Sequence, residues 1–208
     1  AITGGSLGSA VSGTYGQLTL YSNGSYSYNA NNAEALDAGD IVTDSFTYTA
    51  SDGTTNNNAT IEITVKGVND APVGTADAGS VNEDKQLTVS AGSGVLANDT
   101  DADASSSLTV SAVQGQSSNV DSNVTGTYGT LNLDADGSYT YIANQSAADG
   151  LAAGATATDT FAYTVSDGTA TSTVNLVITV TGVGPQAVAD TASVNENVLL
   201  NANNASST

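Results

Sequence analysis

The chain has 208 residues and is strongly acidic, with two Lys or Arg residues against twenty-one Asp or Glu and a formal charge of −19 at pH 7. Nucleic acid is therefore not an expected partner, because it is bound mainly through Lys and Arg, and no stretch has the roughly 18 apolar residues needed for membrane insertion. Without Cys, His or Met, the chain offers hard oxygen ligands, which excludes zinc, copper and haem sites and also thiol or His-based catalysis. We expect a protein that is not an enzyme and whose natural counter-species is a cation.

A pattern near the start of the chain returns about 113 residues later. Residues 13–28 read GTYGQLTLYSNGSYSY, and residues 126–141 read GTYGTLNLDADGSYTY. Further along, DSFTYTASDG at 44–53 returns as DTFAYTVSDG at 159–168. Apolar and polar residues alternate inside these segments, as is typical of strands that bury one face. The sequence therefore predicts an all-β chain of tandem antiparallel β-sandwiches.

The repeat divides the chain into three parts. We expect residues 1–70 to form a first sandwich that lacks its opening strands and residues 71–184 to form a complete second one. Residues 185–208 are expected to supply the opening strand of a third repeat or a strand donated to a neighbouring chain, because DTASVNEN from Asp190 matches DAGSVNED from Asp77.

The two boundaries differ in sequence. The first reads GVNDAP and ends in Pro72, which cannot donate to strand pairing and stiffens the connection. The second, Gly182-Val183-Gly184-Pro185, lacks the Asn-Asp pair. We therefore expect the two linkers to behave differently.

Seven short strands are expected in the complete copy. Between them, Asn-Gly and Asp-Gly dipeptides at 23–24 and 136–137 predict hairpin turns rather than ligand clusters. Two Ala-rich segments, 32–40 and 145–154, could each hold one turn of helix. The expected strands are 81–90, 94–97, 108–113, 128–133, 138–143, 160–165 and 173–180.

The densest group of oxygen ligands is the segment NDTDAD at 98–103. Carboxylates spaced by two along an extended turn can point at one ion, so Asp99, Asp101 and Asp103 are candidate Ca²⁺ ligands. The segment is not an EF-hand, because Ala104 and Val110 stand where that loop needs Gly and Glu. The alternative is a solvated acidic loop.

A second candidate group surrounds the first linker. Glu83, in a VNE motif that follows the linker, is expected to face Asn69 and Asp70 and to share one ion with them across the junction; the alternative is a polar start to a strand. The Ser-Asp-Gly segments at Asp52 and Asp167 are either tight turns or ligand donors.

The ordered set of motifs GVNDAP, SVNED, GVLANDTDAD, GTYGxLxLxxxGSYxY and FxYTxSDG resembles the VCBS or bacterial cadherin-like repeats of large secreted RTX-type adhesins. The resemblance covers most of the chain. It implies Ig-like or cadherin-like β-sandwiches in tandem, Ca²⁺ bound in loops and at junctions, and a secreted protein at the bacterial cell surface. The positions at which it supports ligands are Asn69, Asp70, Glu83, Asp99, Asp101 and Asp103.

Three functions are compatible with these features. The leading hypothesis is a calcium-rigidified spacer or adhesive module whose partners are neighbouring repeats and a surface glycan or protein. The second is a filament subunit that joins identical subunits head-to-tail by donating the strand at 193–201. The third is a carbohydrate-binding module, in which an exposed aromatic residue such as Tyr21 stacks on a sugar.

Overall fold

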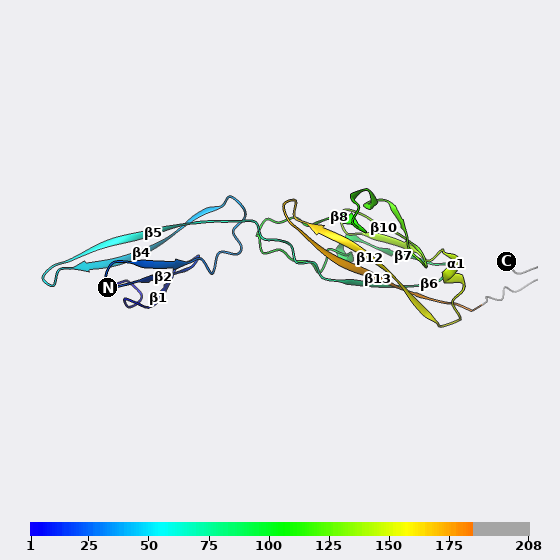
Figure 1. The fold of residues 1–208 in the computed structure, drawn as a ribbon, viewed down its shortest axis with the longest axis horizontal. Helices are drawn as coiled ribbons and strands as arrows, with labels where there is room; N and C mark the ends of the chain where they lie inside the picture. The colour runs from blue at the N-terminus through cyan, green and yellow to red at the C-terminus, as the bar shows by residue number, and fades with distance from the viewer. Residues whose placement is uncertain (185–208) are drawn as a thin grey trace, which may run out of the picture.

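The computed structural model describes residues 1–184, which form two β-rich repeats placed end to end along one axis (Figure 1). In the second repeat two four-stranded sheets lie face to face, with strand orders β7-β11-β10-β9 and β6-β13-β12-β8. All pairs are antiparallel except β6 with β13, which run parallel from Asp77 beside Leu176 to Asn82 beside Thr181. The strands are β6 (Asp77–Asn82), β7 (Gln86–Val89), β8 (Thr109–Val113), β9 (Asn123–Thr125), β10 (Thr130–Leu133), β11 (Tyr139–Ile142), β12 (Thr156–Ser166) and β13 (Thr171–Thr181).

The first repeat reproduces the later part of this arrangement. It has a three-stranded sheet of order β1-β2-β3 and a long hairpin of β4 and β5. The prediction of tandem β-sandwiches is confirmed. The strands are β1 (Ala10–Ser12), β2 (Gln17–Leu20), β3 (Tyr26–Asn29), β4 (Ile41–Ser51) and β5 (Asn56–Lys66).

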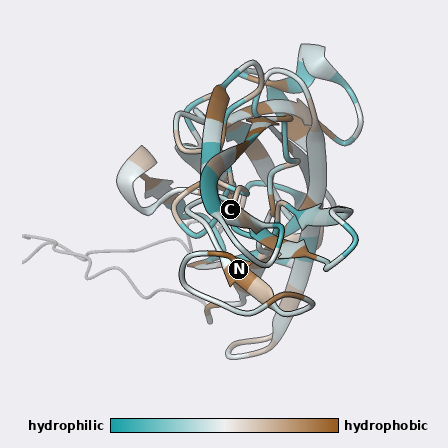
Figure 2. Cartoon of the chain, turned by 90° about the vertical axis from the view of Figure 1, so that its left-hand side faces the viewer, coloured by the Kyte–Doolittle hydropathy of each residue, from teal (hydrophilic) through white to brown (hydrophobic). Residues whose placement is uncertain are grey.

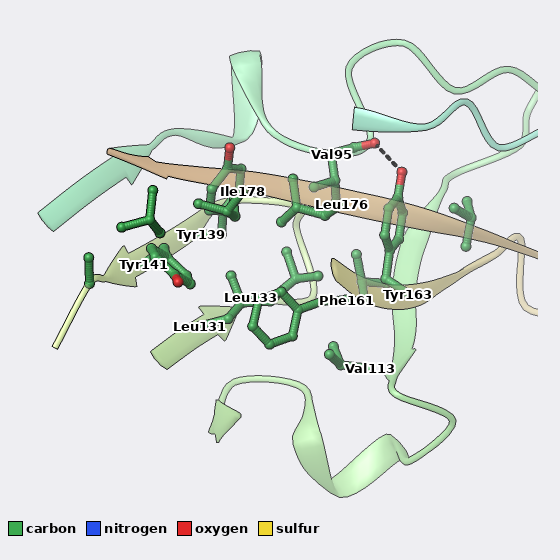
Figure 3. Close-up of a cluster of buried hydrophobic side chains, with 14 of the residues drawn as sticks. Val95, Val113, Leu131, Leu133, Tyr139, Tyr141, Phe161, Tyr163, Leu176 and Ile178 are labelled. Atoms are coloured by element: carbon green, nitrogen blue, oxygen red, sulfur yellow. Dashed lines mark hydrogen bonds between the residues drawn. The ribbon is translucent and has the colours of Figure 1, made fainter. Parts of the chain in front are cut away.

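Each repeat has its own apolar core. The alternation seen in the sequence places every second side chain of a strand between the sheets, and it is visible as bands of brown along the strands in Figure 2. In the second repeat Tyr141 and Phe161 come from opposite sheets and meet edge to face with ring centroids 6.2 Å apart. Figure 3 shows this core, in which the Tyr163 hydroxyl reaches the carbonyl of Val95 at 3.1 Å. The first core is smaller and consists of Ile2, Val11, Leu18, Leu20 and Phe46.

A buried carboxylate explains the GTYG motif. Asp159, 4% exposed, accepts hydrogen bonds from the backbone N–H groups of Thr127, Tyr128 and Gly129 and from the hydroxyl of Tyr141 at 2.7 Å. A Cβ atom at Gly126 would overlap this carboxylate, so the motif needs glycine there.

The first repeat builds the same feature around its own buried carboxylate. Asp44 accepts from the backbone of Thr14 and Tyr15 and from the Tyr28 hydroxyl at 2.7 Å. In each repeat, therefore, one buried carboxylate on one sheet accepts hydrogen bonds from the GTYG loop of the other sheet and ties the two sheets together.

Some predicted elements differ from the structure. The strand expected at 81–90 is two strands, β6 and β7, because the chain turns at Asp84, whose φ is +59°. Residues 94–97 form turns instead of a strand, and the short strand β9 was not predicted. The Ala-rich segment at 145–154 does hold one helical turn, α1 (Ser146–Asp149), whereas the segment at 32–40 holds turns. The Asp-Gly turn at 136–137 is confirmed, with Gly137 at φ +84°.

Across residues 1–184 there is no helix with the length and apolar character needed to cross a membrane. The segment expected to open a third repeat, 185–208, lies outside the described residues.

Candidate metal centre at the repeat junction

The first linker is tied to two loops of the second repeat. The backbone N–H of Asp70 donates to Oδ2 of Asp103 at 2.9 Å. The side-chain amide of Asn69 donates to Oδ2 of Asp167 at 2.9 Å. Four predicted ligand residues from three separate segments therefore lie together where the two repeats meet.

The acidic loop at 99–103 is fixed by its own hydrogen bonds. Asp101 accepts the backbone N–H of Asp103 at 3.0 Å, so these two side chains lie on one turn. Thr100 pairs with Val73 through bonds in both directions, of 2.7 and 3.1 Å, which holds the loop against the chain that leaves the linker. Asp99 accepts the N–H of Thr75 at 2.7 Å.

Buried carboxylate oxygens without a partner mark this loop. Among residues 1–184, the buried side-chain atoms that lack a hydrogen-bond partner are Asp99 Oδ2, Asp101 Oδ2, Asp103 Oδ1 and Glu83 Oε2. All four belong to residues predicted as ligands. A buried charged oxygen left without a partner costs about 1–3 kcal/mol or more, so each of these positions favours a cation.

The pKa values of two carboxylates in and beside this loop, Asp99 and Asp77, are raised. Burial raises the pKa of Asp99, and the nearby carboxylate of Asp77 raises it further. Burial also raises the pKa of Asp77, against the lowering effect of hydrogen bonds from Tyr163 and Asn98. A partly buried carboxylate beside a second carboxylate is stabilised when a cation or a proton is added nearby.

The pKa of Asp167 is shifted in the opposite direction from those of Asp99 and Asp77. Hydrogen bonds from Ala170, Asn69 and Thr169, in that order, lower its pKa. Its Oδ1 accepts the N–H groups of Thr169 and Ala170, both at 2.6 Å, so this residue serves its turn and also holds the linker through its other oxygen.

The first repeat reaches the same loop through a residue that the sequence interpretation did not single out. Asp37 accepts the backbone N–H of Ser105 at 3.0 Å and also its hydroxyl, and the hydroxyl bond lowers the pKa of Asp37 most. Asp37 lies outside the repeated motifs, so little in the sequence indicates that it has a role at the junction. The backbone of Asp37 also lies against Gly67, where a Cβ atom would overlap its carbonyl oxygen.

Glu83 does not face Asn69 and Asp70, and this expectation is wrong. Strand β6 runs parallel to the second half of β13 and carries Glu83 to the opposite end of the repeat, where its N–H donates to the carbonyl of Thr181 at 2.9 Å. There Glu83 is 7% exposed and its Oε1 accepts the N–H of Val183, in the second linker, at 2.9 Å.

Asp52 also lies away from the junction. It occupies the tip of the β4–β5 hairpin, at the outer end of the first repeat in Figure 1. Its Oδ1 accepts the N–H groups of Thr54 and Thr55, and these bonds lower its pKa well below the usual range. In the described residues Asp52 acts as a turn residue.

The carboxylates at the junction do not form a complete Ca²⁺ coordination shell in this arrangement. Within the described part of the chain, no three acidic side chains are close enough together to hold a metal ion as they stand. Calcium needs six to eight oxygens at about 2.3–2.6 Å, so binding at the junction requires side-chain rotations that bring the unpartnered oxygens of Asp101 and Asp103 onto one point. Both residues lie on a loop, where such rotations disturb no strand.

The family profile of the bacterial cadherin-like domain matches residues 2–67 and 69–182. The chain belongs to the bacterial cadherin-like family. The two matched ranges meet at the linker between the repeats. Cadherin-like domains are typically extracellular adhesive or structural modules, act in tandem, generally bind Ca²⁺ and are in general not enzymes.

The similarities to solved structures are weaker than the match to the family profile. Drosophila N-cadherin EC1-4 matches with a TM-score of 0.46 and 12% identity over 83% of this chain and 40% of that one. Mouse clustered PcdhgC3 EC1-3 matches with a TM-score of 0.45 and 17% identity over 85% and 55%. An endo-fucoidan hydrolase from glycoside hydrolase family 107 matches with a TM-score of 0.31 and 22% identity over 84% and 23%. The chain thus spans about half or less of these proteins. No curated protein matches the sequence.

Proposed function

We propose that this chain is a calcium-rigidified spacer or adhesive module of a secreted bacterial surface protein. The observation that carries the proposal is the set of unpartnered buried oxygens on Asp99, Asp101 and Asp103, in the loop that the linker contacts. Oxygen is the ligand type that Ca²⁺ prefers, and the chain contains no His, Cys or Met that would favour a softer metal.

Each residue at the junction has a proposed task. Asp101 and Asp103 would supply the first carboxylate oxygens, with Asp99 beside them on the same loop. Asn69 and Asp70 would supply ligands from the linker, and Asp167 would hold the linker in place. Because the ligands come from both sides of the junction, one ion crosslinks the linker to the second repeat.

The mechanism is electrostatic. Without a cation, clustered carboxylates repel one another. Among residues 1–184, the hydrogen bonds that tie the linker and the first repeat to the second repeat then include those of Asn69 and Asp70 and those between Asp37 and Ser105. With the cation bound, the repulsion becomes attraction and bending at Asn69 and Asp70 requires breaking metal–oxygen contacts. Binding to the folded form alone stabilises it by about 2.7 kcal/mol at a Ca²⁺ concentration one hundred times Kd.

Glu83 could take part in a similar site at the second linker. Its Oε2 is buried without a partner beside Val183. The second linker lacks the Asn-Asp pair, so it offers fewer side-chain ligands to such a site than the first linker does.

Small-angle X-ray scattering of the intact chain tests the rigidity. We expect the maximum dimension to be sharply defined in millimolar Ca²⁺ and the distribution of interatomic distances to broaden when a chelator is added. Asp103→Asn should show the broad distribution even with Ca²⁺, whereas Asp52→Asn, the same chemical change at a distant turn, should behave as the wild type. Identical scattering curves with Ca²⁺ and with chelator would refute the proposal.

A further inference from the structure

The turn between β2 and β3 contains the dipeptide Asn23-Gly24, and Asn23 is the one Asn of the sequence that is followed by Gly. Two backbone hydrogen bonds close this turn. The N–H of Gly24 donates to the carbonyl of Tyr21 at 3.0 Å, and the N–H of Tyr21 donates to the carbonyl of Ser25 at 2.9 Å. Because residue 24 is glycine, no side chain hinders the approach of its backbone nitrogen to the side chain of Asn23.

Ser25 orients the side chain of Asn23. Oδ1 of Asn23 accepts the backbone N–H of Ser25 at 3.0 Å and the Ser25 hydroxyl at 2.7 Å. A backbone N–H can only donate, so the oxygen of the amide, and not its nitrogen, faces Ser25. Two donors on one carbonyl oxygen stabilise negative charge that develops there, as the donors of an oxyanion hole do. The carbon Cγ of Asn23 is therefore activated toward a nucleophile.

The nucleophile within reach is the backbone itself, since a bond from the Gly24 nitrogen to Cγ closes a five-membered ring. We propose that Asn23 is a site of spontaneous deamidation, in which the Gly24 nitrogen displaces the side-chain amide and water then leaves an aspartate or isoaspartate at position 23. The site needs no enzyme and no cofactor.

The reaction balances with water as its only co-reactant. The lone pair of the Gly24 nitrogen forms the bond to Cγ, the bond from Cγ to Nδ2 breaks, and ammonia leaves with the proton that the Gly24 nitrogen gives up. Water then opens the cyclic imide. Opening at Cγ gives aspartate, and opening at the main-chain carbonyl of Asn23 gives isoaspartate. One water is consumed and one ammonia is released, with no oxidation or reduction.

The second repeat carries an aspartate at the equivalent position. Asp136 matches Asn23, and the glycines that follow them, Gly137 and Gly24, have φ values of +84° and +83°. Oδ1 of Asp136 accepts the N–H and the hydroxyl of Ser138 at 2.9 and 2.6 Å. The hydroxyl and then the N–H of Ser138 lower the pKa of Asp136, so this carboxylate is ionised at neutral pH. The same turn thus accommodates aspartate with the same two hydrogen bonds.

The second repeat also shows that this position stays open to water when the turn is covered. The N–H of Val95 donates to the carbonyl of Gly137, and Leu96 lies against the same glycine. Asp136 is nevertheless exposed. The exposure of Asn23, which the reaction needs, is therefore a property of the turn and not of what surrounds the first repeat.

The asparagines near the junction lack these features. Asn69 and Asn98 are each followed by Asp, and their side-chain amides donate to Asp167 and Asp77 at 2.9 and 3.1 Å. These bonds hold the amides in place, and the residue that follows each of them has a side chain. We expect both to persist while Asn23 converts, so the reaction leaves the residues of the junction unchanged.

Mass spectrometry of the intact chain after incubation in the folded state tests the proposal. Digestion with pepsin, at acidic pH, keeps the change from arising during handling. We expect the peptide that contains residue 23 to gain the mass difference between a hydroxyl and an amino group, and anion exchange to resolve a form with one more negative charge. The rate should rise with pH, because the Gly24 nitrogen attacks after it loses its proton. It should be the same in Ca²⁺ and in chelator, which separates this test from that of the junction.

Four variants sharpen the test. Asn23→Gln should not convert, because its ring would need six members, and Asn23→Asp should keep the melting temperature of the wild type. Ser25→Ala should slow the reaction about two- to tenfold, the effect of losing one hydrogen bond to the oxygen that becomes charged. Asp136→Asn places the same dipeptide in the covered turn and should revert to aspartate or isoaspartate.

A residue-23 peptide that keeps its mass would overturn the proposal. So would conversion of Asn23 without conversion of Asp136→Asn, because the reactivity would then belong to the surroundings and not to the turn. An unchanged rate in Ser25→Ala would contradict the activation assigned to Ser25.

Discussion

Replacement of Asp159 by Asn probes the feature on which the fold of each repeat depends. Three donors, from Tyr128, Gly129 and Tyr141, converge on one oxygen of Asp159, and Thr127 donates to the other. The amide of Asn keeps the shape but offers one acceptor oxygen. With that oxygen toward the three donors, its NH₂ group faces the N–H of Thr127 and leaves that donor unpaired.

The expected loss of stability follows from these bonds. An unpaired buried N–H costs about 1–3 kcal/mol, and each of three bonds to an ionised acceptor weakens by about 1 kcal/mol when the acceptor becomes neutral. The relief of burying a charge offsets part of this sum. We expect a net loss of about 3–5 kcal/mol, which lowers the melting temperature of a domain of this size by roughly 15 °C or more.

Differential scanning calorimetry in chelator is the assay, because it resolves separate transitions of the two repeats. Asp159→Asn should lower the transition of the second repeat and leave that of the first unchanged. The control is Asp149→Asn, which makes the same charge change at an exposed position. A loss below about 1 kcal/mol, or equal effects of the two variants, would refute the role given to this carboxylate.

Three further predictions follow from the same geometry. Gly126→Ala should destabilise the second repeat by about 1–3 kcal/mol through overlap with Asp159, whereas Gly92→Ala, into open space, should stay within about 0.5 kcal/mol in urea unfolding. Burial raises the pKa of Asp44, but hydrogen bonds from Tyr28, Thr14 and Tyr15 together hold that pKa below its ordinary 3.8. The ionised carboxylate therefore stabilises the folded first repeat fully above about pH 4, and this stabilisation is lost as the pH falls through the pKa of the folded state. Melting in chelator should therefore show an acid loss in the first repeat that Asp44→Asn reduces, and an unchanged acid limb would contradict this. Asp103→Asn should weaken Ca²⁺ binding at least about tenfold in isothermal titration calorimetry, since a carboxylate ligand is replaced by a neutral amide, while Asp136→Asn should not change it.

The sandwich architecture could be predicted because burial of one strand face leaves a local, period-two pattern in the sequence, and because the chain repeats it. The break between β6 and β7 could not be predicted, because it depends on the positive φ of Asp84, and Asn, Glu and Asp are compatible with either conformation. The role of Asp159 was also missed. Its partners in the GTYG loop lie about 30 residues away, and no local pattern links them.

The candidate site was predictable in composition but not fully in arrangement. Asp101 and Asp103 are neighbours in sequence and remain so in space. Glu83 is close in sequence to Asn69, but the intervening strand β6 carries it to the other end of the repeat. Sequence distance is a poor guide to spatial distance when an extended strand lies between two residues, since each residue adds about 3.3 Å.

A crystal structure of the intact chain grown in millimolar Ca²⁺, with anomalous difference density to identify the metal, tests the central claim most directly. We predict an ion at the junction bound by oxygens of Asp101 and Asp103 together with linker oxygens from Asn69 or Asp70, at about 2.3–2.6 Å. Asp101 and Asp103 directed into solvent at that Ca²⁺ concentration, with no ion between the repeats, would contradict it.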